Sequence, residues 1–435
     1  MRYYTRRAEK AYVAQTTESP ENKYMTIRAN LIVAAVTSMA TAIGCSRPAS
    51  QVTADTIYTG GDIVTVNDAQ PTAEALAVKD GKILAVGARA EIEKVLKGPK
   101  TSVVDLAGRT LIPGFVDAHS HFVSVGLQAL SANLLPPPDG PGSDIPALQK
   151  ALRDFLASSS KPKDYGILIG FNYDDSQLAE KRHPTRRDLD AVSTTIPILA
   201  IHQSGHLAVL NSAGLAKAGI TAETRAPSGG VIQREKDGRT PNGVLEENGF
   251  YAFLPQLLPQ FTPEQLLEQV EAAQSIYVAN GITTAQEGRA MTSMGETLFL
   301  AADRKKLQID VVSYFDLVEV AGSVSKAGQK ILPFAEGAMP IPDRADPSLA
   351  RIQVSRSYVD HLRVGGAKLT FDGSPQGKTA WFTQPYFKPP VGQQAGYLGY
   401  PAFPNPGDAQ EWVDSAYKNN WQLLVHANGD AASTN

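Results

Sequence analysis

The part of the chain that follows Ile112 alternates short β-rich runs with longer amphipathic patterns. Residues 263–280 place apolar side chains at helical spacing, Gly281 follows as a C-cap, and residues 282–285 begin a strand. Further strand patterns lie at 309–315, 366–371 and 421–426, and a helical pattern lies at 408–420. Strands that alternate with helices pair in parallel, so the pattern predicts an α/β fold.

Two regions depart from this alternation. Residues 55–112 hold short β-rich runs with a helical pattern at 91–97, and they predict a small antiparallel sheet domain in which Gly60-Gly61 marks a turn. Residues 127–260 are rich in Pro and Gly and are expected to form a large insertion within 113–435. The insertion has element patterns of its own at 145–157, 166–171 and 197–201.

The N-terminal residues have the pattern of an export signal. Residues 25–45 combine a basic start with a short apolar run and small residues before Cys45, so a secretory signal is expected. Cys45 stands where a bacterial lipoprotein signal places its lipidated residue, and 46–54 is a polar tether; the alternative is a plainly cleaved signal. Residues 1–24 are a doubtful extension, with Met25 the expected start. The interpretation is an exported protein of a Gram-negative periplasm, anchored in the outer membrane by lipid.

Composition excludes several classes of function. Hydrophobic residues make up 43% and charged residues 20% of the 435 residues, which is typical of a globular protein. Lys and Arg number 41 against 44 Asp and Glu, so the basic excess of a general nucleic-acid binder is absent. The single cysteine excludes an internal disulfide and a cysteine-rich zinc module.

The strongest chemical signal is the segment Pro113–His121, which reads PGFVDAHSH. Side chains two residues apart on a strand project to the same side, so His119 and His121 are expected to address one point at the carboxyl end of a strand. Imidazoles are good zinc ligands, and barrel enzymes draw their ligands from several strand ends. The segment therefore predicts part of a metal site.

With its flanking residues, this segment resembles the first-strand metal motif of the amidohydrolase superfamily. Other matches indicate the family 3 branch, which includes N-substituted formamide deformylases. They lie at 188–190, 205–212, 229–232, 237–238, 240–247 and 281–284. The resemblance covers 53–435 and implies a (β/α)8 TIM-type barrel with a small N-terminal β-sandwich domain, the insertion covering one end of the barrel.

The resemblance also implies site residues. Lys368 corresponds to the fourth-strand lysine, which many relatives carboxylate so that it bridges two metals; the alternative is a lysine that orients substrate or pairs with a carboxylate. His426 corresponds to the fifth-strand metal histidine, with a structural histidine as the alternative. Asp372 shares the strand face of Lys368 and is expected to support it at the pocket. The implied metals are one or two divalent ions, zinc first.

Two residues of the insertion are candidates for the substrate pocket. By resemblance His206 and Asn211 line the pocket or hold its lid; the alternative is a buried hydrogen-bonded pair. His183, His202 and His361 are expected to be structural.

The family's barrel has eight strands, and His426 ends the fifth. A sixth-strand histidine and an eighth-strand aspartate, which is the expected general base, have no place before Asn435. A truncated or fragmentary product with about five strands is therefore expected; the alternative is a chain that completes itself by oligomerising.

The resulting hypothesis is a metal-dependent hydrolase of non-peptide carbon–nitrogen bonds. Its substrate is a small amide or N-substituted formamide, attacked by metal-activated water. Its only expected contact with a membrane is the lipid anchor. The alternative is a catalytically dead, truncated amidohydrolase-like envelope lipoprotein.

Overall fold

A computed structural model describes residues 52–227, 230–320, 339–341, 350–352, 357–390 and 393–434. The chain divides between Pro113 and Gly114 into two compact units. The predicted export signal and Cys45 lie outside the described residues. Within the described ranges, no helix is both long and apolar enough to cross a membrane.

The N-terminal unit contains a four-stranded sheet in the order β3-β2-β1-β4. Its elements are β1 (Thr56–Val64), β2 (Thr72–Lys79), β3 (Lys82–Gly87), α1 (Arg89–Leu96) and β4 (Ser102–Asp105). Ile57, Ala75, Ala77 and Ile92 are buried together between the sheet and α1. The prediction of a purely antiparallel sheet was wrong at one edge, because α1 carries the chain back so that β4 pairs in parallel with β1.

The predicted turn at Gly60-Gly61 was also wrong, because the two glycines form an irregularity inside β1. The register against β2 shifts between Thr59 and Ile63. Gly60 has φ +79°, and a Cβ on Gly61 would lie 2.1 Å from the carbonyl oxygen of Arg109. The sequence signal was therefore a bulge with a close backbone approach.

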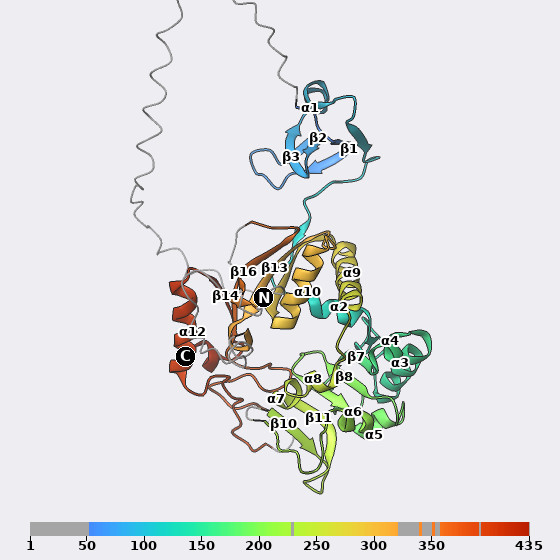
Figure 1. Cartoon of the computed structure of the whole chain (residues 1–435), viewed down its shortest axis with the longest axis vertical. Helices are drawn as coiled ribbons and strands as arrows, with labels where there is room; N and C mark the ends of the chain where they lie inside the picture. The colour runs from blue at the N-terminus through green and yellow to red at the C-terminus, as the bar shows by residue number, and fades with distance from the viewer. Residues whose placement is uncertain are drawn as a thin grey trace, which may run out of the picture. The chain divides into compact units, whose positions relative to one another are not determined.

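The second unit is built around a parallel five-stranded sheet in the order β17-β16-β13-β12-β5. Figure 1 shows β13 and β16 of this sheet side by side. These strands are β5 (Phe115–Val116), β12 (Ile282–Ala290), β13 (Asp310–Asp316), β16 (Leu362–Thr370) and β17 (Gln422–His426). Neighbouring pairs are all parallel, as the alternating pattern predicted. Each strand is added beside the preceding strand of this sheet, so the carboxyl ends of all five open on one edge. The unit is thus an α/β fold with a curled half-barrel sheet.

The main helices of this unit are α2 (Phe122–Ala129), α9 (Pro263–Ala279), α10 (Thr292–Asp303) and α12 (Pro406–Lys418), with a final turn α13 (Asp430–Ser433). The patterns at 263–280 and 408–420 predicted α9 and α12, whereas α2 and α10 were not predicted. Thr262 and Gln265 form a capping box at the start of α9, and Gly281 beyond its end adopts φ +74°. Val270, Ala273 and Tyr277 on α9 enter a core with residues of α2, α10, β12 and β13.

The insertion forms a mixed six-stranded sheet in the order β10-β11-β9-β8-β7-β6. Its strands are β6 (Ala132–Asn133), β7 (Leu168–Tyr173), β8 (Ile198–His202), β9 (Leu207–Leu210), β10 (Gly230–Arg234) and β11 (Pro241–Glu247). Its helices are α3 (Ile145–Ser158), α4 (Lys161–Tyr165), α5 (Arg186–Asp190), α6 (Ser212–Lys217), α7 (Asn248–Tyr251) and α8 (Leu254–Leu257). Alternate residues of β7 and β8 enter two separate cores, one on each face of the sheet. A short antiparallel pair, β14 (Met339–Ile341) and β15 (Ala350–Ile352), lies apart from both sheets.

Candidate active site

The predicted metal ligands lie at the carboxyl edge of the parallel sheet. His119 and His121 follow directly after β5, their rings meeting edge to face with centroids 5.8 Å apart. Lys368 lies near the end of β16 and His426 is the last residue of β17. β5, the strand before the two histidines, is shorter than the sequence suggested, but the two imidazole rings still contact each other.

These four side chains lie close enough for the charges of the other three to affect the pKa of His119. Burial is the main cause that lowers the pKa of the His119 imidazole. The next causes of the lower pKa are the charges of Lys368, His121 and His426, in that order. A histidine with a lowered pKa is neutral at pH 7, which is the form that binds a metal ion.

Lys368 is 2% exposed, although lysine is almost never fully buried without a partner. Burial lowers the pKa of its amine, the charge of Arg289 lowers it further, and Asp316 opposes the effect. Arg289 Nε lies 2.8 Å from Asp316 Oδ2, and Asp316 is the register partner of Lys368 on β13. Burial and Arg289 therefore hold the pKa of the Lys368 amine below its ordinary value.

A buried carboxylate that the sequence reasoning missed supports His121. Glu287 on β12 is fully buried, and its Oε1 lies 3.5 Å from His121 Nδ1. It also accepts the backbone N–H groups of Val123 and Arg289. A carboxylate beside one imidazole nitrogen orients the other toward a metal, as is usual for metal-binding histidines. No local signal could have shown this contact, because the two residues are 166 positions apart.

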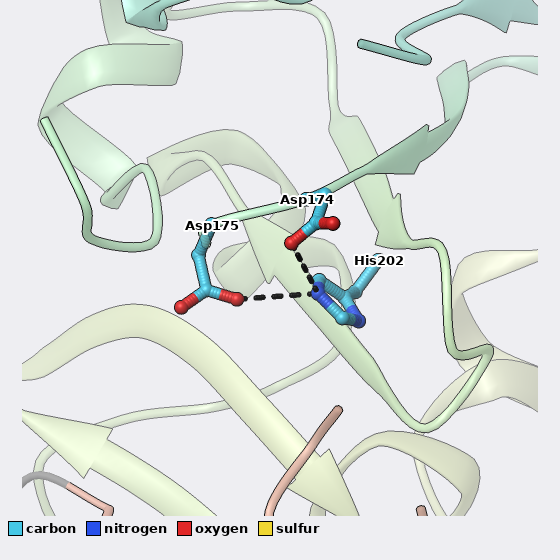
Figure 2. Close-up of side chains that lie close together, drawn as sticks. All are labelled: Asp174, Asp175 and His202. Carbon is cyan, nitrogen blue, oxygen red and sulfur yellow. Dashed lines mark ion pairs between the residues drawn. The ribbon is translucent and has the colours of Figure 1, made fainter. Parts of the chain in front are cut away.

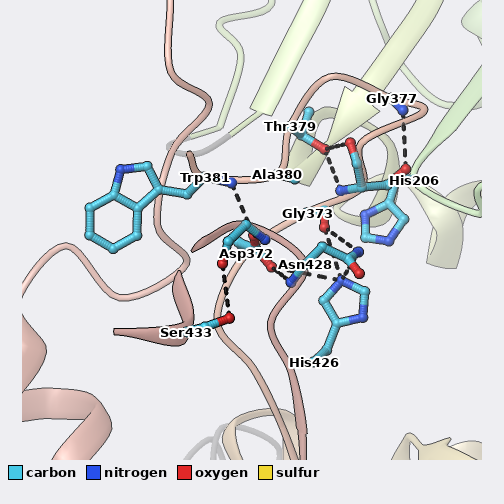
Figure 3. A network of polar contacts seen from close by, with 12 residues as sticks. His206, Asp372, Gly373, Gly377, Thr379, Ala380, Trp381, His426, Asn428 and Ser433 are labelled. Atoms are coloured by element: carbon cyan, nitrogen blue, oxygen red, sulfur yellow. Dashed lines mark hydrogen bonds and ion pairs between the residues drawn. The ribbon is translucent and has the colours of Figure 1, made fainter. Parts of the chain in front are cut away.

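His426 is oriented by the loop that follows β16. Its Nε2 lies 2.9 Å from the carbonyl oxygen of Gly373 and 3.0 Å from Asn428 Nδ2 (Figure 3). The carbonyl can only accept and the amide nitrogen can only donate, so Nε2 has a protein partner in either tautomer. Nδ1 is therefore the atom of His426 that is suited to a metal ion.

Asp372 lies beneath His426 and not on a pocket surface, so the prediction of a pocket residue needs correction. It is 2% exposed, and its carboxylate accepts the backbone N–H groups of Trp381, Asn428 and Gly429 at 2.7–2.9 Å. Oδ1 also lies 3.9 Å from His426 Nε2. The carboxylate fixes the two loops that hold His426, because it satisfies three of their backbone donors.

The two candidates from the insertion have different positions. Asn211 is fully buried; its Oδ1 accepts from Ile198 and Gly214, and its Nδ2 donates to the carbonyls of Ser193 and Ile196. It therefore follows the buried, hydrogen-bonded alternative and caps α6. His206, by contrast, reaches the site, since its ring centroid lies 5.8 Å from that of His426.

A second group of possible metal ligands lies inside the insertion and includes His202, which was expected to be structural. Asp174, Asp175 and His202 place one ligand atom each within 4.8 Å of one another (Figure 2). His202 Nε2 lies 3.2 Å from Asp175 Oδ1 and 4.0 Å from Asp174 Oδ1. However, His202 Nδ1 accepts the backbone N–H of Ser204, so the proton of a neutral ring lies on Nε2. Nε2 therefore faces the two carboxylates at ion-pair distance without a hydrogen bond to either of them.

The remaining histidines are engaged in pairs. His183 Nδ1 lies 3.0 Å from the Tyr173 hydroxyl, and burial lowers the pKa of His183 to about 4. His361 Nδ1 lies 2.8 Å from Asp310 Oδ1 at the amino end of the parallel sheet. Both positions agree with the structural roles expected from the sequence.

Comparison with known proteins shows the family. A model of the amidohydrolase family matches residues 102–435, and the chain belongs to that family. It is 32% identical over 250 residues to the exoenzymes regulatory protein AepA of Pectobacterium carotovorum subsp. carotovorum, covering 57% of this chain and 51% of that protein. It is also 32% identical over 193 residues to an N-substituted formamide deformylase of Arthrobacter pascens, covering 44% of this chain and 34% of that protein. The chain thus spans about half or less of the length of these two relatives.

Solved structures show a similar fold. An uncharacterized metal-dependent hydrolase from Pyrococcus horikoshii aligns with a TM-score of 0.60 at 20% identity, covering 87% of this chain and 66% of that one. A second one, from Pyrococcus furiosus, aligns with a TM-score of 0.58 at 20% identity, covering 87% and 68%. At this identity the likeness is one of fold.

Proposed function

We propose that the protein is a metal-dependent hydrolase of carbon–nitrogen bonds in small amides. The observation that carries the proposal is that two histidines, a buried lysine of lowered pKa and a third histidine converge at the carboxyl edge of one parallel sheet. Ligands drawn from several strand ends of an α/β sheet are typical of catalytic metal sites. The expected (β/α)8 barrel with its N-terminal β domain is part of this proposal.

The donor set fits one or two divalent ions, with zinc the first choice. His121 presents Nε2 because Glu287 lies beside Nδ1, and His426 presents Nδ1 because Gly373 and Asn428 contact its Nε2. His119 and Lys368 complete the set. A bound divalent ion would polarise the substrate carbonyl and lower the pKa of a water ligand to near 7.

Lys368 is proposed to act as a carbamate. Only a neutral amine adds CO2. Burial and the charge of Arg289 both lower the pKa of the Lys368 amine. The carbamate would supply two anionic oxygens where a free ammonium would repel a cation. The test is incubation with ¹³C-bicarbonate: a carbamate signal that Lys368→Ala abolishes is expected, and its absence in the unaltered protein would refute this step.

N-substituted formamides are the proposed substrate class. The support is the family, together with the relative from Arthrobacter pascens. The test is turnover of a panel of amides, formamides and esters by zinc-loaded protein. Hydrolysis of formamides that is lost in the His119→Ala/His121→Ala double variant is expected. A folded, zinc-bound protein that hydrolyses none of the panel would overturn the proposal in favour of a non-catalytic envelope protein.

Export with a lipid anchor on Cys45 is proposed on the sequence pattern alone. The test is mass spectrometry of the N-terminal peptide from the membrane fraction of expressing cells. A diacylated or triacylated Cys45 is expected, and an unmodified Cys45 or a cleavage site elsewhere would contradict it.

A further inference from the structure

The insertion brings one side chain into the candidate metal centre. His206 lies in the turn between β8 and β9, and His426 ends β17 of the parallel sheet. Their rings are 5.8 Å apart between centroids and inclined by 33°, as their neighbouring positions in Figure 3 show. His206 is therefore placed to contact a molecule bound beside His426.

His206 is held by a buried glutamate from the same insertion. Both carboxylate oxygens of Glu247, the last residue of β11, lie 2.9–3.0 Å from His206 Nδ1. The Glu247 N–H also donates to the His206 carbonyl at 2.8 Å. A third contact comes from the loop after β16, where Thr379 Oγ1 donates to Glu247 Oε1 at 2.5 Å.

The backbone of Glu247 is in an unusual conformation, with φ +48° and ψ −124°. A non-glycine residue with such angles is strained and persists only where the surrounding contacts determine it. Strain of this kind is concentrated at functional sites, and in this conformation the Glu247 carboxylate faces His206.

This arrangement determines which atom His206 offers to the site. A carboxylate only accepts hydrogen bonds, so His206 Nδ1 carries a proton and Nε2 of the neutral ring keeps a lone pair. In the described part of the chain, no residue hydrogen-bonds to that Nε2. His202 has the opposite tautomer, with the proton on Nε2. His206 thus presents a hydrogen-bond acceptor beside the ring of His426.

We propose that His206 Nε2 accepts a hydrogen bond from the N–H of a secondary amide, and that the site therefore selects N-monosubstituted over N,N-disubstituted substrates. The inference rests on the proposed hydrolase function and narrows its substrate class. Glu247 acts as a positioning residue, because it fixes the tautomer and orientation of His206 without touching the substrate.

The selectivity follows from the hydrogen bond alone. An N-methyl group in place of the N–H would leave the lone pair of a largely buried ring without a partner, since the His206 side chain is 12% exposed. Leaving such a group unsatisfied is expected to lower kcat/KM by roughly 10- to 100-fold, which is about 1.4–2.7 kcal/mol.

The test compares N-butylformamide with N-butyl-N-methylformamide on the zinc-loaded full chain. The unaltered protein is expected to prefer the first by about 10- to 100-fold. His206→Ala should reduce this preference to about 3-fold or less, because it removes both the hydrogen bond to the first probe and the unsatisfied lone pair that faces the second. His361→Ala, which removes another carboxylate-paired histidine, is the matched control and should keep the preference.

A readout that does not depend on turnover is the tautomer of His206, seen by ¹⁵N NMR of histidine-labelled protein. Protonated Nδ1 with unprotonated Nε2 is expected, and Glu247→Gln should disturb this signal and the probe preference together. A protonated Nε2 in the neutral ring would overturn the proposal, as would an equal loss for both probes in His206→Ala.

Failure of the proposed function is distinguishable from failure of this inference. If neither probe is hydrolysed, the hydrolase proposal fails by itself. The ratio of the two dissociation constants, measured by ligand-observed NMR, then decides the inference: a ratio above about 10 that His206→Ala removes supports it, and a ratio near one refutes it.

Discussion

Replacement of Asp372 by asparagine tests how the loops beneath the candidate site are held. In the unaltered protein, Oδ2 accepts from Trp381 N at 2.9 Å and Gly429 N at 2.7 Å, and Oδ1 accepts from Asn428 N at 2.9 Å. The side chain is fully buried, so water cannot replace these bonds. An asparagine oxygen can keep the first two bonds, but its NH2 group then faces the N–H of Asn428.

The magnitude follows from these three bonds. Two hydrogen bonds to a charged acceptor become neutral ones, which costs about 1 kcal/mol each. The Asn428 N–H loses its acceptor, which costs about 1–3 kcal/mol. We therefore expect the free energy of unfolding to fall by about 3–5 kcal/mol, a large part of the stability of an ordinary domain.

Urea denaturation at pH 7 measures this loss, and hydrogen exchange at the Trp381, Asn428 and Gly429 amides locates it. Asp430→Asn is the matched control, because this exposed neighbour also accepts a backbone N–H, from Thr383, but water can replace it. A smaller loss is expected for the control. Equal losses in the two variants, or unchanged exchange at the three amides, would refute the reasoning.

Three further predictions concern the surroundings of the site. Glu287→Gln should weaken zinc binding by about 10- to 100-fold without unfolding the protein, because it removes the charge beside His121; an unchanged affinity in a zinc titration would contradict this. Burial lowers the pKa of His183 from 6.5 to about 4, so the folded state binds fewer protons and stability falls as pH drops from 6.5 to 4. The free energy of unfolding should fall by about 3 kcal/mol at most through this titration. For His183→Asn, the difference between urea curves at pH 7 and pH 4 should be smaller by that amount. Gly429→Ala should destabilise the loop after β17, because a Cβ would lie 1.7 Å from the Trp381 carbonyl oxygen, and a melting temperature equal to the unaltered one would disprove that contact.

Local signals predicted much of the fold. The apolar spacing of 263–280, with Gly281 after it, gave the position of α9 within one residue at each end. The alternation of such helices with β-rich runs predicted the parallel sheet. By contrast, the Gly60-Gly61 pair is compatible with either a turn or a bulge. Only the close approach of the Arg109 carbonyl oxygen decides between them.

The candidate ligands were also accessible from sequence, since His119 and His121 belong to a short motif and Lys368 and His426 to matched strands. The groups that orient them were not. Glu287 meets His121 across 166 residues, and Thr379 meets Glu247 across 132. Such contacts depend on how the sheets and loops pack, which no local pattern encodes.

The tautomers required the structure for a similar reason. His202 and His206 are four residues apart, yet one accepts a backbone N–H at Nδ1 and the other faces a carboxylate there. Their chemistry differs because their partners come from different elements.

Zinc titration of two variants tests the central claim most directly, namely that the metal centre lies at the carboxyl edge of the parallel sheet. Isothermal calorimetry would compare the unaltered protein with His119→Ala/His121→Ala and with His202→Ala. We expect the first variant to lose at least one bound zinc and the second to bind zinc as the unaltered protein does. Retained zinc in the first variant with loss in the second would place the metal with Asp174 and Asp175 and contradict the account.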